Sequence, residues 1–484
     1  MNRRWFLRLV GLSAGLGSLT SLGVGGSWYA GRRADERRLN ETLARLDADD
    51  SDWHVVGVVK AHNAAIPDDD AANVTKVTLS ALGWRPPSGK ARQDAINAKE
   101  IPDLAWDDDR LPHDDAFCSL YEVHLESGQA HLEAFAARKL PTGGRAFHFG
   151  EPDPFGTLFP ELFRVRECCV LFRDYATVEA YFSRGDEGLR AAEASLHFTQ
   201  ASLATEPTLI AQLVRNAGCA LAVGSAQQSL AWAEPAAGLA ELQAAFAQAA
   251  TVDGLTPAAR GERAATMRTF DNVRSGALPS DYFETLDDFG GGGAAQSGWD
   301  RWRRRWNAPN RVRQAEALLW LHNGLVAAMK LQGPDRRAAC QAALDSATPE
   351  VAALTPSVSK CVEADDRCKA QLLCASVGLA CERHRRRFGR FPASLADIPA
   401  SILPSIPADP FNGFSLGYRV LADGACAYSV GPDGLHRGTP DETVSVRDSQ
   451  IFSFRLWNPE ARRRPPLPRP VQEPDDLLDT LGEP

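Results

Sequence analysis

The stretch that decides the fold, residues 368–391, is CKAQLLCASVGLACERHRRRFGRF. Within it Leu372, Leu373, Val377 and Ala380 recur at the spacing of one helical face. Apolar residues at this spacing predict an amphipathic helix whose apolar stripe faces a core. We therefore expect a long helix here that is buried along that stripe.

The end of this helix is marked as clearly as its buried face. Arginines at 385–387 fall in the last turn, where cations interact favourably with the carbonyl end of the helix dipole. Gly389 can adopt the left-handed conformation that caps a helix, and Pro392 prevents its continuation. The predicted helix therefore spans residues 362–388.

Two short strands are expected after the helix. Residues 416–420 and 425–430 have the composition of strands, and Asp423-Gly424 lies between them. An Asp-Gly pair between two such runs is typical of a tight hairpin. The pattern predicts a small C-terminal α+β module, made of a helix and a β-hairpin.

The order of motifs in this module also resembles a known one. The motifs are Gly389-x-Phe391-Pro392, Asp409-Pro410-Phe411 and Ser429-x-Gly431-x-Asp433-Gly434. They resemble the C-terminal module of the major pseudopilins of type II secretion. The resemblance implies a calcium site in the last of these loops, with Ser429 and Asp433 as ligands.

Calcium takes roughly six to eight oxygen ligands, so two residues cannot hold it alone. Asp441, Glu442 and backbone carbonyls would have to complete the site. The alternative is that Asp433-Gly434 only shapes a turn. No other cofactor is expected.

The chain as a whole resembles a group of uncharacterised bacterial envelope proteins. These pair an N-terminal anchor with a long helical body and the same C-terminal module. The shared landmarks are Asp52-Trp53, Glu241-Leu242-Gln243 and Gly261-Glu262-Arg263. The group has no established activity, so the resemblance implies an architecture and no reaction.

The N-terminal segment has the features of an export signal or a membrane anchor. Arg3-Arg4 followed by Phe6-Leu7 resembles a twin-arginine signal. Residues 9–31 contain no charged side chain and are long enough to span a bilayer. We expect a location in the cell envelope, either anchored in the inner membrane through this segment or periplasmic.

The charge distribution argues against a nucleic-acid partner. The net charge of the chain is −9, whereas residues 1–38 carry seven arginines against Asp35 and Glu36, which is +5. The remaining chain therefore carries −14, since −9 minus +5 is −14. Binding to a phosphate backbone depends on Lys and Arg, so an acidic body excludes this class of partner.

Helical periodicity dominates the middle of the chain. The predicted helices cover residues 34–46, 131–139, 162–181, 186–204, 208–233, 239–250, 257–270 and 315–332. Without a fixed-length repeat, these predict a mainly α fold, an irregular helical bundle or array. The expected divisions are a signal or anchor (1–31), a mixed region (32–127), a helical domain (128–360), the C-terminal module (361–458) and a Pro-rich disordered tail (459–484).

The cysteines are expected to act as small core residues. Cys361, Cys368, Cys374 and Cys381 are spaced seven, six and seven residues apart. On one helix such intervals rise roughly 9–10 Å, which is beyond the reach of a disulfide. The chain also lacks a Cys-x-x-Cys zinc pair.

The sequence contains none of the common catalytic signatures. Zinc-protease, Walker and dinucleotide-binding motifs are all missing, and the ten histidines are scattered. We therefore expect an envelope protein that binds or scaffolds an unidentified protein partner. The alternative is an envelope hydrolase whose site is assembled from residues far apart in the sequence.

Overall fold

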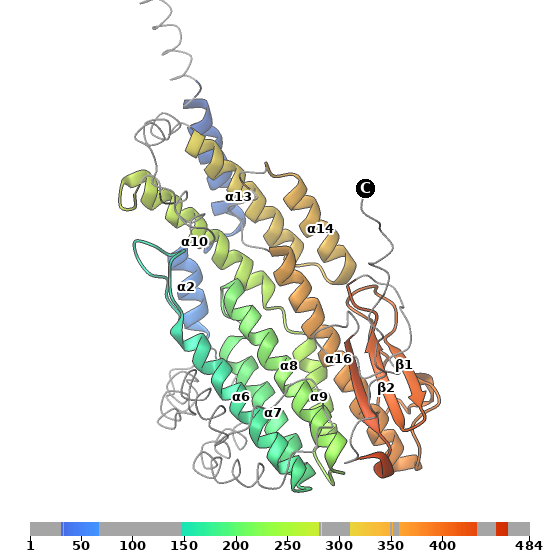
Figure 1. Ribbon diagram of the computed structural model, residues 1–484. Helices are drawn as coiled ribbons and strands as arrows, with labels where there is room; N and C mark the ends of the chain where they lie inside the picture. Colours follow the sequence, from blue (N-terminus) through green and yellow to red (C-terminus); the bar gives the residue numbers. More distant parts are fainter. Residues whose placement is uncertain are drawn as a thin grey trace, which may run out of the picture.

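The computed structural model confirms a mainly α-helical protein with a small antiparallel sheet (Figure 1). It describes residues 31, 33–66, 147–279, 282, 310–348, 351, 358–432 and 452–462. The helices are α2 (Val55–Ala64), α6 (Pro160–Tyr181), α7 (Gly185–Leu203), α8 (Leu209–Trp232), α9 (Leu239–Ala250), α10 (Leu255–Ser275), α13 (Asn310–Met329), α14 (Gly333–Asp345) and α16 (Val358–Phe388). The strands are β1 (Gly417–Leu421), β2 (Gly424–Ser429) and β3 (Phe452–Trp457), and the short 3-10 helices are η2 (Leu395–Asp397) and η3 (Pro459–Ala461).

Local signals set the ends of these helices. Pro160 occupies the first turn of α6, where its missing N–H costs nothing. The Thr208 side chain caps α8 by accepting a hydrogen bond from the Ala211 amide at 3.3 Å. Gly389, at φ +77°, ends α16, and its amide donates to the Arg385 carbonyl at 2.7 Å.

The predicted helices that fall on described residues are present, with ends shifted by a few residues. The helix predicted at residues 131–139 lies outside the described residues. Helices α2 and α14 were not predicted. In α14 only Arg336 and Cys340 are buried, so its sequence carries little of the apolar periodicity that marks a helix.

Helix α16 lies at the centre of the molecule. It packs against α8, α9, α14, β2 and β3. The core around it combines Leu372 and Val377 of α16 with Leu242 and Phe246 of α9 and with Phe454 of β3. Of the stripe predicted from the sequence, Leu372, Val377 and Ala380 are buried, whereas Leu373 is only partly buried. The expected burial of this helix is therefore confirmed.

The sheet has the order β1-β2-β3, and both pairs are antiparallel. The predicted hairpin is present, and its two-residue loop is Ala422-Asp423, one residue earlier than the predicted Asp423-Gly424, because Leu421 pairs with Gly424. Strand β3 was not predicted. It packs against α16 at Gly378, where an added Cβ would lie 2.3 Å from the Phe454 ring. Glycine is needed here because the helix and the sheet approach each other so closely.

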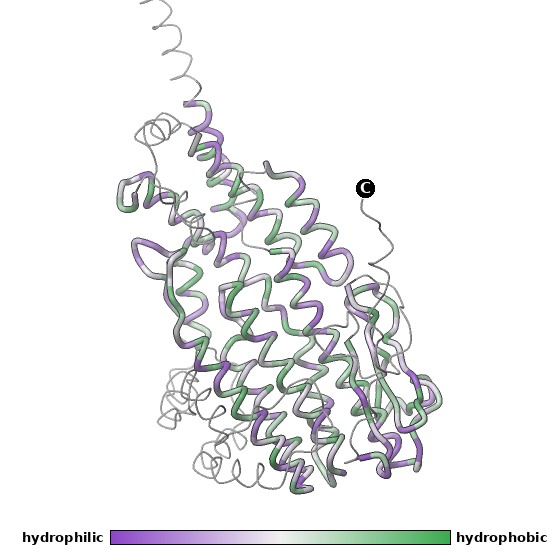
Figure 2. The backbone as a smooth tube through the Cα atoms, in the orientation of Figure 1, coloured by the Kyte–Doolittle hydropathy of each residue, from purple (hydrophilic) through white to green (hydrophobic). Residues whose placement is uncertain are grey.

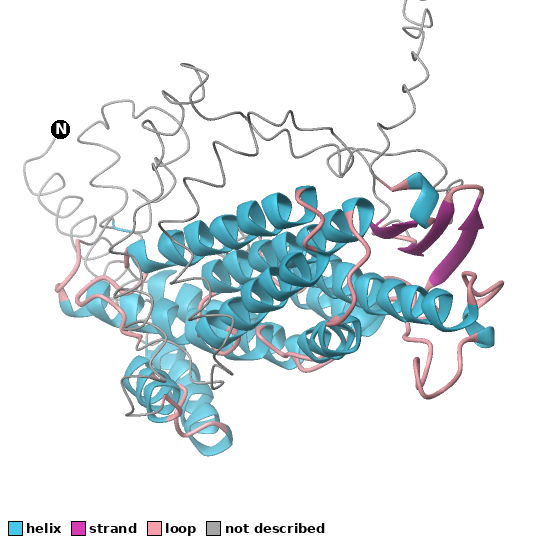
Figure 3. Ribbon diagram, turned by 90° about the horizontal axis from the view of Figure 1, so that it is seen from below, coloured by secondary structure: helices cyan, strands magenta, loops and turns pink. Residues whose placement is uncertain are grey.

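Two further cores complete the bundle. One joins the helical segment 33–49 with α10, α13, α14 and the start of α16. The other lies between α6, α7 and α8. Figure 3 shows the strands gathered at one end of the molecule, with helices forming the rest.

Hydrophobic and hydrophilic residues are interspersed along the helices (Figure 2), as in helices that pack on one side. Among the described residues, one helix, α8, has the length and mean hydropathy (1.3) of a membrane span. Its most apolar window is 61% buried inside the bundle. The segment proposed as an anchor or signal, residues 1–30, lies outside the described residues.

Candidate functional site

Ser429, a predicted calcium ligand, lies at the end of β2 and is fully buried. Its hydroxyl donates to Asp409 Oδ1 at 2.9 Å and accepts from the Gly431 amide at 3.3 Å. Asp409 also accepts from the amides of Phe411 and Val430, each at 2.9 Å. The carboxylate therefore fastens the turn at residues 409–413 to the end of the hairpin, and Ser429 belongs to this fastening.

The other predicted site residues cannot be placed. Asp433, Asp441 and Glu442 of the calcium loop and Arg3, Arg4, Phe6 and Leu7 of the export signal lie outside the described residues. Within the described ranges, no group of three or more His, Cys, Asp or Glu side chains could hold a metal ion. The calcium site stays a prediction from the sequence.

The most concentrated buried chemistry lies where α8, α14 and α16 meet. We call it the Asp365 cluster, and its members are Arg215, Arg336, Arg337, Asp365, Asp366 and Lys369. Asp365 and Asp366 are both fully buried, although they are charged residues within a helix. Carboxylates buried in this way need cationic partners to offset the loss of hydration.

Asp365 has three such partners. Its Oδ1 lies 2.9 Å from Arg215 Nη2, and its Oδ2 lies 2.9 Å from Arg336 Nη1 and 3.1 Å from Lys369 Nζ. Burial raises the pKa of Asp365, but Lys369, Arg215 and Arg336 outweigh burial and hold the pKa below its ordinary value. Asp365 is therefore ionised at neutral pH.

Asp366 pairs with Arg336 and, at 2.6 Å, with Arg337 Nη1. Here burial prevails over the arginines and raises the pKa of the carboxyl group. Arg337 also donates to the carbonyls of Pro410 (3.0 Å) and Phe411. The cluster is thus tied to the same turn that Asp409 fastens to the hairpin.

The Asp365 cluster holds more positive than negative charge. Its two carboxylates face four cations, Arg215, Arg336, Arg337 and Lys369. Three buried N–H groups make no hydrogen bond, namely Nε and Nη1 of Arg215 and Nε of Arg336. Asp365 Oδ2 also makes no hydrogen bond, so this site leaves both donors and an acceptor unmatched.

Two thiols stand next to Arg215. Cys219 follows it by one turn on α8, and Cys368 follows Asp365 by one turn on α16. The Cys219 sulfur accepts a hydrogen bond from Gln200 Nε2 at 3.2 Å. The pKa of Cys219 is lowered by the Cys368 thiol, with Arg215 and Gln200 adding to the effect against burial and Asp365.

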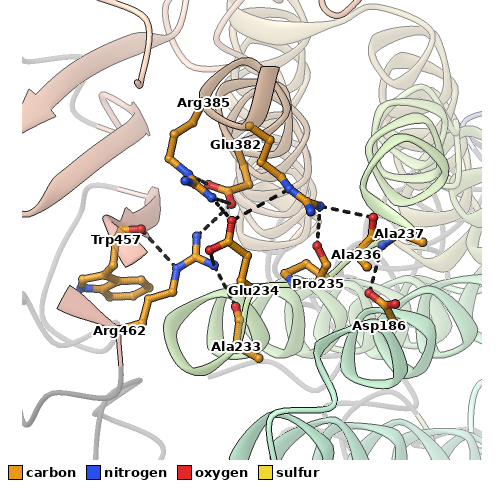
Figure 4. A network of polar contacts seen from close by, with 11 residues as sticks. Asp186, Ala233, Glu234, Pro235, Ala236, Ala237, Glu382, Arg385, Trp457 and Arg462 are labelled. Carbon is orange, nitrogen blue, oxygen red and sulfur yellow. Dashed lines mark hydrogen bonds and ion pairs between the residues drawn. The ribbon is translucent and has the colours of Figure 1, made fainter. Parts of the chain in front are cut away.

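A second buried ion cluster ties the last described residues to the bundle (Figure 4). We call it the Glu382 cluster, and its charged members are Glu234, Glu382, Arg385, Arg386 and Arg462. Arg385 Nη2 lies 2.8 Å from Glu382 Oε1 and 2.6 Å from Glu234 Oε1. Burial raises the pKa of Glu382, and Arg385 and Arg462 outweigh burial and lower it.

Arg462, which follows β3 and η3 in the chain, completes this cluster. It donates to Glu382 Oε1 at 2.8 Å, to the Ala233 carbonyl at 2.9 Å and to the Trp457 carbonyl at 3.3 Å. Its three contacts reach α16, the end of α8 and the end of β3. The Glu382 cluster therefore fixes the chain after β3 to the helices.

The sequence landmarks that suggested a resemblance to the envelope group fall on packing contacts. Gln243 bridges α9 to the loop before β1, because its Nε2 donates to the Ile402 carbonyl at 2.8 Å. Gly261 leaves room for the Pro207 carbonyl, which would lie 1.8 Å from an added Cβ. Trp53 donates to Asp47 Oδ1 at 2.7 Å and lies under the Arg263 guanidinium. These residues hold elements together.

Among the described residues, one ion pair between a histidine and a carboxylate is buried. His62 Nε2 of α2 lies 3.9 Å from Glu206 Oε1, in the loop between α7 and α8. Glu206 is fully buried and His62 nearly so. Another buried histidine, His322, has its pKa lowered to about 4 by burial and by Arg263, so it is neutral at pH 7.

Neither ion cluster was singled out from the sequence, although one signal was available. Asp365 falls four residues after Cys361, three before Cys368 and seven before Leu372, which places it on the predicted apolar stripe. A charged residue on such a stripe must find a buried partner. Its partner Arg215 lies 150 residues away, and only the fold identifies it.

Comparison with known proteins does not identify a family. No family model matches the chain, and comparisons with curated proteins and with solved structures found no match. The resemblances to the pseudopilin module and to the envelope group stay predictions that depend on their sequence motifs.

Proposed function

We propose that this chain is an envelope protein, exported or anchored in the inner membrane, that acts as a rigid scaffold and binds a protein partner. The observation that carries the scaffold proposal is the shared core: residues of α8, α9, α16 and β3 belong to one hydrophobic cluster. Separating the sheet from the bundle would expose that apolar surface to water, which opposes hinge motion between them.

Polar contacts support the same rigid connection. Gln243 of α9 accepts from Arg383 at 2.7 Å through its side chain and from Ser376 at 3.2 Å through its carbonyl. The Glu382 cluster adds a charged link from the chain after β3 to α8 and α16. A unit that is fixed at several points holds its surfaces in constant relative positions, as a scaffold requires.

The location rests on the N-terminal segment. Arginines flank the uncharged residues 9–31 on both sides, with Arg3, Arg4 and Arg8 before them and Arg32 and Arg33 after. A segment of this kind is inserted or exported because its uncharged stretch matches the bilayer thickness. The acidic remainder supports a partner other than nucleic acid.

The location is tested by changing Arg3 and Arg4 together to Lys in a tagged full-length chain. If the pair is a twin-arginine signal, the variant accumulates in the cytoplasm while the parent reaches the envelope. The matched control is the same double change at Arg32 and Arg33. Equal envelope fractions for parent and variant would contradict the twin-arginine proposal and leave an ordinary anchor.

The scaffold is tested by cross-linking intact cells, solubilising the membrane fraction and purifying the tagged chain. We expect one partner in a fixed ratio, identified by linked peptides. A chain with Glu382→Gln and Arg462→Gln, which loosens the attachment of the sheet, should lose the partner while staying in the envelope. A chain that remains free of linked peptides would overturn the proposal.

A second candidate, an envelope hydrolase, is favoured by the pair of His62 and Glu206. A buried carboxylate can orient a histidine that acts as a general base. The purified chain is assayed against chromogenic esters, phosphates and peptides, with His62→Asn and Glu206→Gln as variants. Turnover that both variants abolish would favour the hydrolase over the scaffold.

A further inference from the structure

The end of α16 presents a concentrated basic surface. Residues 383–396 contain five arginines and no aspartate or glutamate. Arg386, Arg387 and Arg390 are exposed. Arg386 is partly engaged, because its Nε lies 4.0 Å from Glu234 Oε1 and its Nη1 donates to the Ala236 carbonyl at 3.4 Å. Within the part of the chain that the structure describes, Arg387 and Arg390 pair with no carboxylate.

An aromatic ring lies among these cations. Phe388 is 48% exposed, and the Arg387 guanidinium lies 5.4 Å from the centroid of its ring. The helix dipole accounts for cations in the last turn of α16 but not for an exposed phenylalanine between them. We call Arg386, Arg387, Phe388 and Arg390 the Phe388 surface. Its chemistry is complementary to an acidic segment that also carries apolar side chains.

The C-terminal tail of the same chain has this composition. Residues 470–484 carry five carboxylates and no lysine or arginine. Leu477 and Leu478 stand next to each other within this acidic stretch. The carboxylates belong to Glu473, Asp475, Asp476, Asp479 and Glu483.

The fold brings the start of this tail to the Phe388 surface. Arg462, the last described residue, donates to Glu382 Oε1 at 2.8 Å, and Glu382 lies one turn before Arg386 on α16. From Glu382 to Phe388 the helix rises roughly 9 Å. Residues 463–472 separate Arg462 from Glu473. A flexible segment of this length spans roughly 16–19 Å, so the acidic stretch can reach the surface.

We propose that residues 473–479 of the tail dock on the Phe388 surface of their own chain. The carboxylates pair with Arg387 and Arg390, and the two leucines cover the Phe388 ring. Exposed ion pairs are individually weak, but the tether keeps the segment at an effective concentration of roughly millimolar. The contact closes this surface to other acidic segments, and it does not depend on the proposed scaffold function.

The contact is tested directly by a zero-length cross-link in the full-length chain, purified in a neutral detergent. Arg387→Lys keeps the positive charge and supplies an amine, which a carbodiimide joins to a carboxylate within contact distance. We expect peptides that link position 387 to Asp475, Asp476 or Asp479 in the monomer band. Raising the salt concentration to about 1 M should strongly reduce their yield, because it screens exposed charges.

Two controls separate docking from random collisions of the tail. Lys360 is exposed near the start of the same helix, roughly 40 Å from position 387, and should form no link to the tail. In the Arg387→Lys chain, Arg390→Glu should suppress the link and Arg390→Lys should preserve it. Equal links from Lys360 and position 387, links confined to dimers, or no link to the tail would overturn the proposal.

A second measurement uses a dye-labelled peptide of residues 471–484 and its fluorescence anisotropy. The peptide should bind a full-length chain whose tail is neutralised by Asp475→Asn, Asp476→Asn and Asp479→Asn. It should bind the parent about tenfold more weakly or less, because the tethered tail already occupies the surface. Adding Arg387→Glu to the neutralised chain should abolish binding. Equal binding to parent and neutralised chains, or binding to neither, would contradict docking of the tail.

Discussion

The two buried ion clusters on α16 differ in how completely their charges and hydrogen bonds are matched. In the Glu382 cluster two glutamates face three arginines, and Arg462 fills its remaining donors with the Ala233 and Trp457 carbonyls. In the Asp365 cluster two aspartates face four cations, and three arginine N–H groups have no partner. Both clusters are buried along the same helix.

The two clusters differ in whether all of their hydrogen-bonding groups have partners. A fully satisfied cluster stabilises one arrangement, since each donor and acceptor has already found its partner. The Asp365 cluster leaves both donors and an acceptor unmatched. We therefore interpret the Glu382 cluster as a fastening and the Asp365 cluster as a less completely matched part of the core.

The largest expected effect comes from removing Asp365. Asp365→Ala leaves Arg215, Arg336 and Lys369 without their shared carboxylate inside the core. Breaking a buried ion pair from one side costs about 3–5 kcal/mol. Urea unfolding of the variant and its parent, measured at the same protein concentration, should show a loss of unfolding free energy of this size.

The control for this prediction is Glu363→Ala on the same helix. Glu363 forms an exposed i,i+4 pair with Arg367 and should contribute only about 0.3–0.5 kcal/mol. Equal losses for the two variants would contradict the view that the Asp365 cluster is an essential part of the core.

Glu382→Gln should have a smaller effect, because the matched cluster retains other contacts. Arg385 still pairs with Glu234, and Arg462 still donates to two carbonyls. The loss of charge-assisted hydrogen bonds costs about 1.5–3 kcal/mol. Urea unfolding measures the loss of stability in Glu382→Gln and in the control Glu187→Gln. Glu187 is an exposed glutamate that pairs with Arg190. A loss larger than that of Asp365→Ala would reverse the ranking of the clusters.

Gly378→Ala tests the apolar contact between α16 and β3, for comparison with the charged contacts of the Glu382 cluster. The new Cβ would overlap the Phe454 ring, so β3 must shift away from α16. Overpacking of this kind costs about 1–3 kcal/mol. Gly224→Ala in α8 is the matched control, since nothing lies within 4 Å of its added Cβ and alanine favours the helix. A stabilised Gly378→Ala chain would show that the sheet tolerates displacement.

The smallest effect is a difference in pH dependence between the clusters. The pKa of Glu382 is lowered in the fold, so its stabilisation is present above its unfolded pKa of about 4.3 and is lost as the pH falls through the folded value. The stability gap between parent and Glu382→Gln should therefore be constant from neutral pH to about pH 5 and then narrow.

Asp366 should respond with the opposite sign. Burial raises its pKa, so the ionised carboxyl group is unfavourable in the fold at neutral pH, and protonation relieves this as the pH falls through the folded value. Relative to Asp366→Asn, the parent should gain stability over that range. Urea midpoints measured from pH 7 to pH 3.5 provide both comparisons, and parallel curves would contradict them.

Most helix ends could be predicted because their causes are local. Helix α9 spans Leu239–Ala250, as its sequence pattern predicts, and α16 ends at Phe388 before Gly389. Strand β3 could not be recognised in the same way. Its partner in the sheet is β2, and the closest support for Phe454 comes from Gly378 on a distant helix.

The candidate site was less accessible to sequence reasoning than the fold. The loop motif identified Ser429, but not that its hydroxyl donates to Asp409. The spacing of cysteines along one helix excludes disulfides within α16, yet it says nothing about a thiol on another helix. Cys219 of α8 belongs to the same hydrophobic cluster as Cys368.

The sequence by itself determines the helices, their caps, the hairpin and the charge imbalance between the first residues and the rest. Each of these depends on neighbours within a few residues, such as Thr208 with Ala211 or Asp423 with Gly424. The tertiary structure alone decided which buried charges and thiols meet. Arg215 and Asp365 are 150 residues apart in the sequence, and their contact arises only when α8 packs on α16.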